Sequence, residues 1–294
     1  MNINQIEMLL CTLNTGSIAA AARQMGKSRT TLSSALSALE DELGVKLFDR
    51  SGNRISATSI GEAIADDCQR LVALKNDIHT KCAQHLEDID MTLRIVRDDA
   101  LPEQFWRTLL YKLNQRFPST NLSIYIAPSP ELETMVEQNT VDVAYGLLPT
   151  YNDAKRTQQQ ELGKIRMMCV AHAEHPLNKL KKVHNTDLEL YTQITLAFID
   201  KANLTSTPSL SSNFIALTFY EHIRDAVMDK AGWSYVPWLL IKEPLLSGLL
   251  GVVKYNRAMH WLPYGELVKT ENAQSVIIKW ISAEVEQYLL SVSV

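Results

Sequence analysis

Residues 16 to 50 carry the pattern that most restricts the fold of this chain, because a single glycine there separates two short helices. An alanine-rich amphipathic segment runs from Ser17 to Met25 and stops at Gly26. Glycine adopts a left-handed conformation without strain, so Gly26 can end one helix and let the next leave at a steep angle. The polar run that starts at Ser28 is a suitable N-terminal cap for a second helix, which extends to about residue 43.

The second helix has two contrasting faces. Leucines at helical spacing form one apolar stripe: Leu32, Leu36, Leu39 and Leu43. The opposite face carries short or forked hydrogen-bonding groups: Arg29, Thr30, Ser33, Ser34 and Ser37. An ordinary helical pair in a core would explain the stripe but not this polar face. A helix that touches base edges in a major groove needs such groups, so we interpret the pair as a DNA-binding helix-turn-helix.

The same stretch resembles the DNA-binding region of the LysR-type transcriptional regulators. The residues that match in one register are Ile6, Leu9, Gly16-Ser17, Ala21-Ala22, Met25, Ser28, Ser33, Leu39-Glu40, Leu43-Gly44, Leu47-Phe48, Arg50, Thr58 and Gly61. The resemblance implies a winged helix-turn-helix over residues 1–58, with a first helix near 3–14. The wing would turn at Ser51-Gly52-Asn53, with Phe48 and Ile55 facing inwards and Thr58 capping the next helix.

We predict that nine residues contact DNA: Ser28, Arg29, Thr30, Thr31, Ser33, Ser34, Lys27, Arg50 and Arg54. Arg29 is the leading candidate for reading a base, because the family usually has glutamine there and a guanidinium fits O6 and N7 of guanine. Contact with a phosphate alone is the alternative for Arg29. Ser34 replaces a residue that is often arginine in the family. Lys27, Arg50 and Arg54 are candidates for phosphates or the minor groove, with solvated surface charge as the alternative.

The net charge does not indicate a strong nucleic-acid binder on its own. The chain has 29 basic and 33 acidic residues, for a net charge of -4. Residues 1–60 hold almost equal numbers of basic and acidic groups. A single copy should therefore bind double-stranded DNA weakly, and useful affinity implies a homodimer or homotetramer.

Residues 59–90 predict one long helix without proline that links two domains. Its apolar positions alternate at spacings of four and three, as in a coiled coil: Ile64, Cys68, Leu71, Lys75, Ile78, Cys82, His85 and Ile89. A helix packed on its own domain is the alternative. The resemblance implies a dimerising linker helix at this place.

Residues 91–294 alternate between strand and helix, which predicts a parallel α/β sheet. The expected strands lie near 93–96, 122–127, 141–147, 165–172, 193–199 and 233–236, and the expected helices near 103–116, 130–138, 215–230 and 273–290. The resemblance implies a two-lobed, periplasmic-binding-protein-like effector domain. The matching motifs are looser here: Phe117-Pro118, Asp142-Val143-Ala144, His175-Pro176-Leu177 and Gly232 to Pro237. Lobe 1 is expected over about 91–164 and 265–294, and lobe 2 over about 165–264.

A small-molecule effector is expected between the lobes, where open α/β sheets present strand ends and helix N-termini. The candidate residues are Arg97, Asp98, Asp99, Ser129, Phe198, Val236 and Pro237. The acidic pair Asp98 and Asp99 would repel an anion unless Arg97 turned inwards, which favours a neutral or cationic effector, or none. As the alternative, both carboxylates cap the following helix or face water.

The remaining motifs favour no other chemistry. Cys169, His172 and His175, and likewise His79, Cys82 and His85, have metal-like residue types, but their spacing fits packing better. We expect no metal, no cofactor and no catalytic residue, because no nucleophile–base pair or phosphate loop occurs. Four widely spaced cysteines, no leader-like N-terminus and no membrane span favour a cytoplasmic protein.

The sequence as a whole predicts a bacterial regulator that binds an imperfect palindrome through paired winged helix-turn-helix units, with RNA polymerase as a further partner. Two alternatives stay open. One is a stand-alone small-molecule binder or enzyme on the same scaffold, and the other is a redox or metal sensor that uses Cys82 or Cys169.

Overall fold

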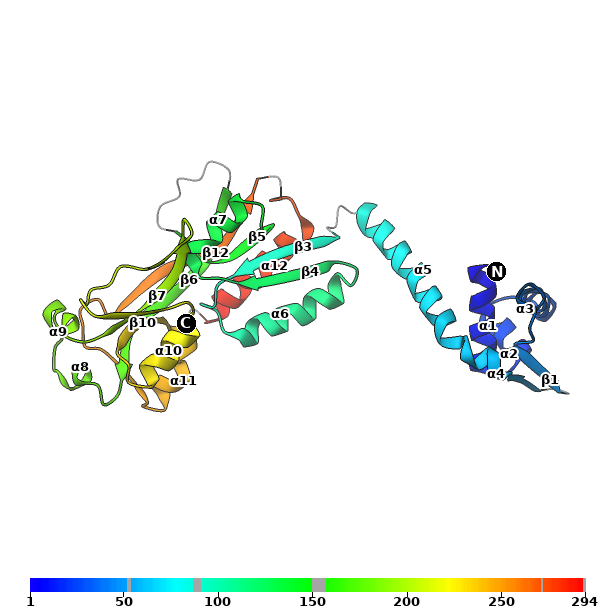
Figure 1. Cartoon of the computed structure of the whole chain (residues 1–294), viewed down its shortest axis with the longest axis horizontal. Helices are drawn as coiled ribbons and strands as arrows, with labels where there is room; N and C mark the ends of the chain where they lie inside the picture. Colours follow the sequence, from blue (N-terminus) through cyan, green and yellow to red (C-terminus); the bar gives the residue numbers. More distant parts are fainter. Residues whose placement is uncertain (52–53, 87–90, 150–156, 271, 293–294) are drawn as a thin grey trace. The chain divides into compact units, whose positions relative to one another are not determined.

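The computed structural model describes residues 1–51, 54–86, 91–149, 157–270 and 272–292 (Figure 1). The chain divides into two compact units, Met1–Glu87 and Asp88–Val294. The first unit holds the predicted helix-turn-helix and the second the predicted α/β domain.

The first unit is a winged helix-turn-helix, as predicted. Its elements are α1 (Ile3–Thr15), α2 (Ile18–Gln24), α3 (Arg29–Leu43), β1 (Phe48–Ser51) and β2 (Arg54–Ala57), with β1 and β2 antiparallel. Gly26 has a φ of +62°, so it supplies the left-handed turn between α2 and α3. Ser28 caps α3 as expected, since its side chain accepts a hydrogen bond from the Thr31 N–H.

Three of the four leucines in the α3 stripe are buried. Leu32, Leu36 and Leu39 share a core with Ile6 and Leu9 of α1, and with Ala21, Leu47 and Phe48. Leu43 is 40% exposed, so the predicted stripe is wrong at its last position. Leu43 is the final residue of α3, and the chain turns away at Gly44, which has a φ of +70°.

The predicted linker is helical, although Ile64 separates it into α4 (Ser59–Ala63) and α5 (Ala65–Leu86). The Thr58 side chain caps α4 by accepting from the Gly61 N–H, and it donates to the Lys46 carbonyl at 2.8 Å. A Cβ atom at Gly61 would lie 2.3 Å from the Leu47 carbonyl oxygen, so α4 packs closely on the chain before the wing. Helix α5 instead packs on α1.

The predicted seam of α5 has two separate roles. Cys68 is buried in the core of the first unit, and Lys75 Nζ lies 2.6 Å from Glu7 Oε1 of α1. The alternative prediction, a helix that packs on its own domain, is therefore correct for Cys68 and Lys75. Leu71, Leu74 and Ile78 remain 38%, 54% and 54% exposed. The His85 side chain and Ile89 lie outside what the structure describes.

The second unit contains one mixed sheet in the strand order β4-β3-β5-β12-β6-β10-β7-β8, with β9 beside β7 and β11 beside β6. The strands are β3 (Thr92–Arg97), β4 (Asn121–Ile126), β5 (Val143–Leu147), β6 (Thr157–His172), β7 (Gln193–Asp200), β8 (Asn203–Ser206), β9 (Phe214–Leu217), β10 (Trp233–Pro237), β11 (Leu250–Val252) and β12 (Met259–Lys269). Strands β3, β4 and β5 are parallel, but β12 is antiparallel to both β5 and β6. The prediction of a parallel sheet is therefore wrong at its centre, because β12 brings the chain back against β5 and β6.

Helices cover both faces of this sheet. They are α6 (Glu103–Arg116), α7 (Leu132–Glu137), α8 (Pro176–Lys179), α9 (Asn185–Glu189), α10 (Tyr220–Met228), α11 (Trp238–Leu246) and α12 (Val276–Val292). Leu109 of α6, Ile241 of α11 and Ile281 of α12 share one core, whereas α7 packs in a second core and α8 and α9 in a third. The predicted helix over 215–230 is wrong at its start, because that stretch first pairs with β7 as β9.

Two long strands connect the halves of the sheet. Strands β6 and β12 pair along their length, with an irregularity between Tyr264 and Gly265. The predicted lobe boundaries at 164/165 and 264/265 fall inside these strands. The bounds themselves stay predictions, and below we call the β3–β5 side with α6, α7 and α12 the first half, and the β7–β10 side with α10 and α11 the second half.

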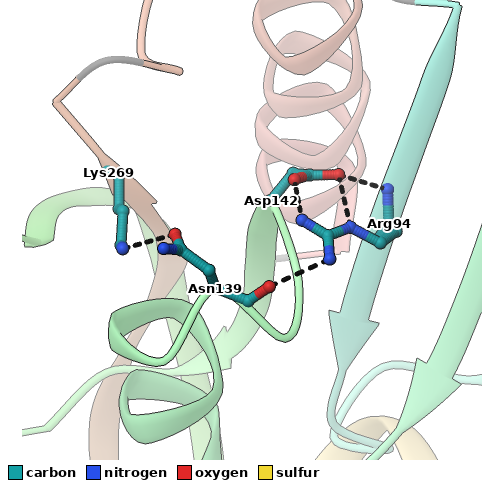
Figure 2. Close-up of polar contacts among 4 residues, drawn as sticks. All are labelled: Arg94, Asn139, Asp142 and Lys269. Atoms are coloured by element: carbon teal, nitrogen blue, oxygen red, sulfur yellow. Dashed lines mark hydrogen bonds and ion pairs between the residues drawn. The ribbon is translucent and has the colours of Figure 1, made fainter.

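The predicted Asp142-Val143-Ala144 motif has a structural role (Figure 2). Asp142 accepts hydrogen bonds from the Arg94 backbone at 2.7 Å and from its guanidinium at 2.6 and 3.2 Å. Arg94 also donates to the Asn139 carbonyl at 2.9 Å, and Lys269 of β12 donates to the Asn139 side chain. These contacts join β3, β12 and the turn before β5 at one end of these strands.

Candidate functional site

The N-terminal turn of α3 brings together most of the residues predicted to contact DNA. Ser28 Oγ lies 2.8 Å from both Thr30 Oγ1 and Thr31 Oγ1, so three of these hydroxyls form one cluster at the cap. Ser28 therefore positions the helix N-terminus, where free backbone N–H groups favour an anion such as a DNA phosphate.

The two charged residues of this surface, Lys27 and Arg29, are exposed to solvent. Ser34 is also exposed, and Ser33 is half-buried. Among the described side chains, Arg29 has no ion-pair partner, and the first turn of α3 has no acidic residue. The guanidinium of Arg29 is thus free to meet a base or a phosphate. The side chains of Arg50 and Arg54 lie outside the described ones, although their backbones form β1 and β2.

Glu40 supports this surface from within, through contacts that the sequence did not reveal. Its buried carboxylate accepts hydrogen bonds from the N–H groups of Leu47 at 2.9 Å and Phe48 at 3.2 Å, and from Lys46 Nζ at 3.2 Å. Burial alone would raise the pKa of Glu40, but these donors together hold it below its ordinary value. Glu40 therefore fixes the recognition helix α3 to the start of the wing. Its place within the Leu39-Glu40 match was the one signal in the sequence.

In the second unit, Arg97 turns into the protein. Its side chain is buried, with the guanidinium carbon 5.0 Å from the centre of the Trp106 ring. It also donates to the Asp98 carbonyl at 3.2 Å and forms an ion pair with Glu103. These contacts hold Arg97 within the first half, and its predicted contact with an effector stays a prediction.

Asp98 is buried and has three donors. Its carboxylate accepts from Ser129 Oγ and the Leu147 N–H, both at 2.7 Å, and from the Ala100 N–H at 3.1 Å. Burial raises the pKa of Asp98 from 3.8 to about 6, although these hydrogen bonds oppose the shift. A Cβ atom at Gly146 would lie 2.8 Å from Asp98 Oδ2. Asp98 and Ser129 thus bond to each other within the first half.

The side chain of Asp99 forms a hydrogen bond that joins the two halves of the domain. Its carboxylate accepts from the Glu221 N–H at 2.9 Å, in the first turn of α10. Burial raises the pKa of Asp99. Glu131 makes a second contact between the halves, since its side chain accepts a hydrogen bond from the Ile199 N–H at 2.7 Å. Asp98 and Asp99 are thus bonded within the protein, and the prediction of a neutral or cationic effector, or of none, stays a prediction.

The other predicted effector residues lie in or beside the sheet. Phe198 is half-buried in β7, and Val236 and Pro237 are buried in β10. A cavity of about 830 Å³ lies elsewhere, between α6 and α12 on one side and α10 and α11 on the other. None of the seven predicted effector residues lines this cavity.

The structure adds nothing in favour of a metal or redox centre. Among the described residues, no group of three or more His, Cys, Asp or Glu side chains is placed to hold a metal ion. Burial raises the pKa of the Cys169 thiol to about 12, which disfavours the reactive thiolate. Cys82 is exposed.

Each helix in the described part of the chain is too short or too polar to cross a membrane.

Two family models match the chain and together span nearly all of it. Residues 3–62 match "Bacterial regulatory helix-turn-helix protein, lysR family", and residues 87–289 match "LysR substrate binding domain". Similar sequences include the multiple virulence factor regulator MvfR of Pseudomonas aeruginosa, 28% identical over 86% of this chain and 75% of that protein. The HTH-type transcriptional regulator AceR of Acinetobacter baumannii is 26% identical over 83% of this chain and 82% of that protein.

Similar solved structures share the fold. The full-length LTTR LysG of Corynebacterium glutamicum with bound effector Arg has a TM-score of 0.52 at 17% identity, and covers 99% of each chain. The LysR-type transcriptional regulator CrgA of Neisseria meningitidis has a TM-score of 0.52 at 19% identity, over 98% of this chain and 99% of that one.

Proposed function

Because this chain belongs to the lysR family of bacterial helix-turn-helix regulators, we propose that it reads a palindromic promoter site as a homodimer or homotetramer and responds to a small-molecule effector. The family membership makes the chain a DNA-binding transcriptional regulator with an effector-binding domain, and not an enzyme. The palindrome, the assembly and the effector are the parts that we propose. We further propose that it acts in the cytoplasm, beside RNA polymerase.

The observation that carries the proposal is the open N-terminal turn of α3. Arg29 and Lys27 are exposed there next to the Ser28 cap, and Glu40 fixes α3 to the wing. A recognition helix needs these features to place its first turn against base edges while neighbouring groups hold the phosphates. We assign base reading to Arg29 and phosphate contact to Lys27.

The exposed side of α5 supports self-association. Leu71, Leu74 and Ile78 lie at spacings of three and four, on one stripe of the helix, and none is buried within its own unit. A second copy would remove this apolar surface from water. Pairing also doubles the number of DNA contacts, which the nearly neutral first unit requires.

An effector is supported by the family and by one relative. LysG binds Arg as its effector in the solved structure with the same fold. The predicted contact set of Arg97, Asp98, Asp99, Ser129, Phe198, Val236 and Pro237 stays a proposal for the rim of such a site. Four of these residues, Arg97, Asp98, Asp99 and Ser129, are bonded within the protein, so an effector that met their side chains would have to displace protein contacts.

The proposal can be tested by gel-shift titration with the DNA that lies upstream of the protein's own gene. The wild-type chain should bind with an affinity that falls steeply as salt rises. Leu74→Glu should abolish dimerisation in analytical ultracentrifugation and weaken DNA binding at least ~10-fold. Gln69→Glu adds the same charge at an exposed position of α5 away from the stripe and should behave as wild type. A Leu74→Glu chain that still dimerises would contradict the assigned interface.

A further inference from the structure

Two connecting segments of the second unit, residues 179–185 and 254–257, carry five cations and no carboxylate. The first segment leads from α8 to α9, and the second leads from β11 to β12. The cations are all exposed: Lys179, Lys181, Lys182, Lys254 and Arg257. We call these five residues the basic patch. The chain as a whole has a net charge of -4, so this concentration of positive charge is local.

Backbone contacts hold the two segments of the basic patch side by side. The Val183 N–H donates to the Lys254 carbonyl at 2.9 Å, and Val183 pairs with Tyr255 in an isolated parallel bridge. The hydroxyl of Tyr255 donates to Asn185 Oδ1 at 2.7 Å. Val183 is buried, so it anchors the first segment to the protein. The fold therefore fixes the positions from which the cations project.

The positive charge of the basic patch is not neutralised by the chain itself. Among the described residues, none of the five cations has an ion pair. Glu174 pairs instead with Lys230 at 2.6 Å, and Asp187 accepts from the His184 N–H at 2.8 Å. If Asp187 and Glu189 of α9 are counted, five cations still face only two carboxylates. The excess charge favours an anionic partner outside the chain.

A hollow of about 500 Å³ lies between the two segments, and no carboxylate lines it. Its polar lining consists of Lys182, His184, Asn185, Thr186, Tyr255 and Asn256. Amide, hydroxyl and ammonium groups are the side-chain donors that commonly contact phosphate oxygens. Lys182 is the one cation of the patch that lines the hollow, so a small anion there would leave the other four unmatched. An extended polyanion could meet all five.

The composition of the basic patch favours nucleic acid over a protein as this polyanion. Protein interfaces are poor in lysine and rich in aromatic residues, whereas four of the five cations here are lysines. Tyr255 is the only Phe, Tyr or Trp in the two segments. Double-stranded DNA is the polyanion that a lysR-family helix-turn-helix protein binds. Contacts from the second unit would add to the affinity of the nearly neutral first unit.

We propose that the basic patch binds the phosphate backbone of double-stranded DNA, so that the second unit adds contacts to those of the recognition helix. The proposal rests on DNA binding itself, and not on the proposed palindrome, assembly or effector. Each phosphate contact releases counterions from the DNA. The patch should therefore raise the affinity and steepen its dependence on salt, without changing the sequence that is read.

The test measures binding of the full chain to a long fragment of the upstream DNA by fluorescence anisotropy, over a series of salt concentrations. The variant with Lys181→Gln, Lys182→Gln and Lys254→Gln loses three exposed cations of the patch. Its affinity at low salt should fall at least ~10-fold, because three phosphate contacts per chain are lost. The slope of log affinity against log salt should become shallower by up to about three for each chain on the DNA.

A matched control removes the same charge elsewhere on the second unit. Lys112→Gln, Lys164→Gln and Lys279→Gln alter three exposed lysines outside the patch. This variant should keep the wild-type affinity and slope. A change in the patch variant alone then reports a contact at the patch, since the net charge of the two variants is equal.

Lysine acetylation of the wild-type chain, read by mass spectrometry with and without DNA, tests the contact without any substitution. DNA should protect Lys181, Lys182 and Lys254, and leave Lys112 and Lys279 reactive. Unchanged acetylation of the patch would overturn the proposal, as would a patch variant with wild-type affinity and slope. Either result would leave an acidic protein as the partner that fits the patch.

Discussion

Asp99 and Glu221 lie 122 positions apart in the sequence, yet the carboxylate of Asp99 accepts a 2.9 Å hydrogen bond from the backbone N–H of Glu221. The N-terminus of a helix ordinarily attracts an anion. In this domain the protein's own carboxylate takes that place on α10, and Glu131 adds a parallel contact to Ile199. The two halves are thus joined by internal carboxylates where the sequence suggested an effector.

Removing the Asp99 contact should loosen α10. Asp99→Ala leaves the first-turn N–H groups of α10 without an acceptor, which typically costs about 1 kcal/mol of stability. Amide hydrogen exchange at Tyr220 and Glu221 should accelerate correspondingly. Asp99→Asn keeps an acceptor oxygen and should lose less. Unchanged exchange in Asp99→Ala would show that the contact does not hold the helix.

Asp98 should make the second unit more stable at acidic pH than at neutral pH. In the folded chain the Asp98 carboxyl keeps its proton up to about pH 6, because its pKa is raised to about 6. In the unfolded chain the same carboxyl has a pKa of 3.8 and loses its proton near that pH. The folded state binds more protons in this window, so the contribution of Asp98 to the free energy of unfolding falls as pH rises from about 4 to 6. Urea unfolding followed by tryptophan fluorescence reports this unit, because all five tryptophans lie within it. Asp98→Asn should flatten that part of the profile, and an identical slope would contradict the assignment.

Glu40 should control the stability of the DNA-binding unit. Glu40→Ala leaves the Leu47 and Phe48 N–H groups unsatisfied and should cost about 2–3 kcal/mol, whereas Glu40→Gln keeps one acceptor and should cost about 1 kcal/mol. The pKa of Glu40 is lowered by folding, so its contribution is present above about pH 4.5 and is lost as pH falls below that value.

Hydrogen exchange of peptides from α3 and β1 would measure the Glu40 effect without a tryptophan in this unit. Glu42→Ala is the matched control, since among the described residues Glu42 makes only an exposed ion pair with the N-terminus. Equal protection in Glu40→Ala and Glu42→Ala would contradict the role given to Glu40.

Arg29 should determine which base is read. In a set of DNA duplexes permuted at each position of the half-site, Arg29→Ala should lose about 1–3 kcal/mol of discrimination at one base pair. Lys27→Ala should instead weaken all sequences alike and lower the salt slope by about one. If Arg29→Ala also weakened every sequence equally, Arg29 would be a phosphate contact.

The helix-turn-helix could be predicted from sequence because its determinants are local. Gly26, the Ser28 cap and the spacing of Leu32, Leu36 and Leu39 act within one or two helical turns. Asp98 has one local partner, the Ala100 N–H, but its contact with the Leu147 N–H spans 49 residues and the contact of Asp99 with the Glu221 N–H spans 122, so no local pattern revealed these two contacts.

The strand around Ile215 could not be predicted for the same reason, because it depends on contacts with a distant segment. An apolar segment at this place fits a helix or an edge strand equally well, and its pairing with β7 decides the outcome. Likewise, the cavity between α6 and α10 depends on how distant helices meet, which periodicity does not encode.

Footprinting on the DNA upstream of the protein's own gene tests the central claim most directly. We predict two protected half-sites related by a twofold axis, about 10 base pairs or a multiple of a helical turn apart, whose protection disappears as salt is raised. Arg29→Ala should shift or relax the protected sequence. No protection at any salt concentration, from a chain shown to be folded and dimeric, would contradict the account.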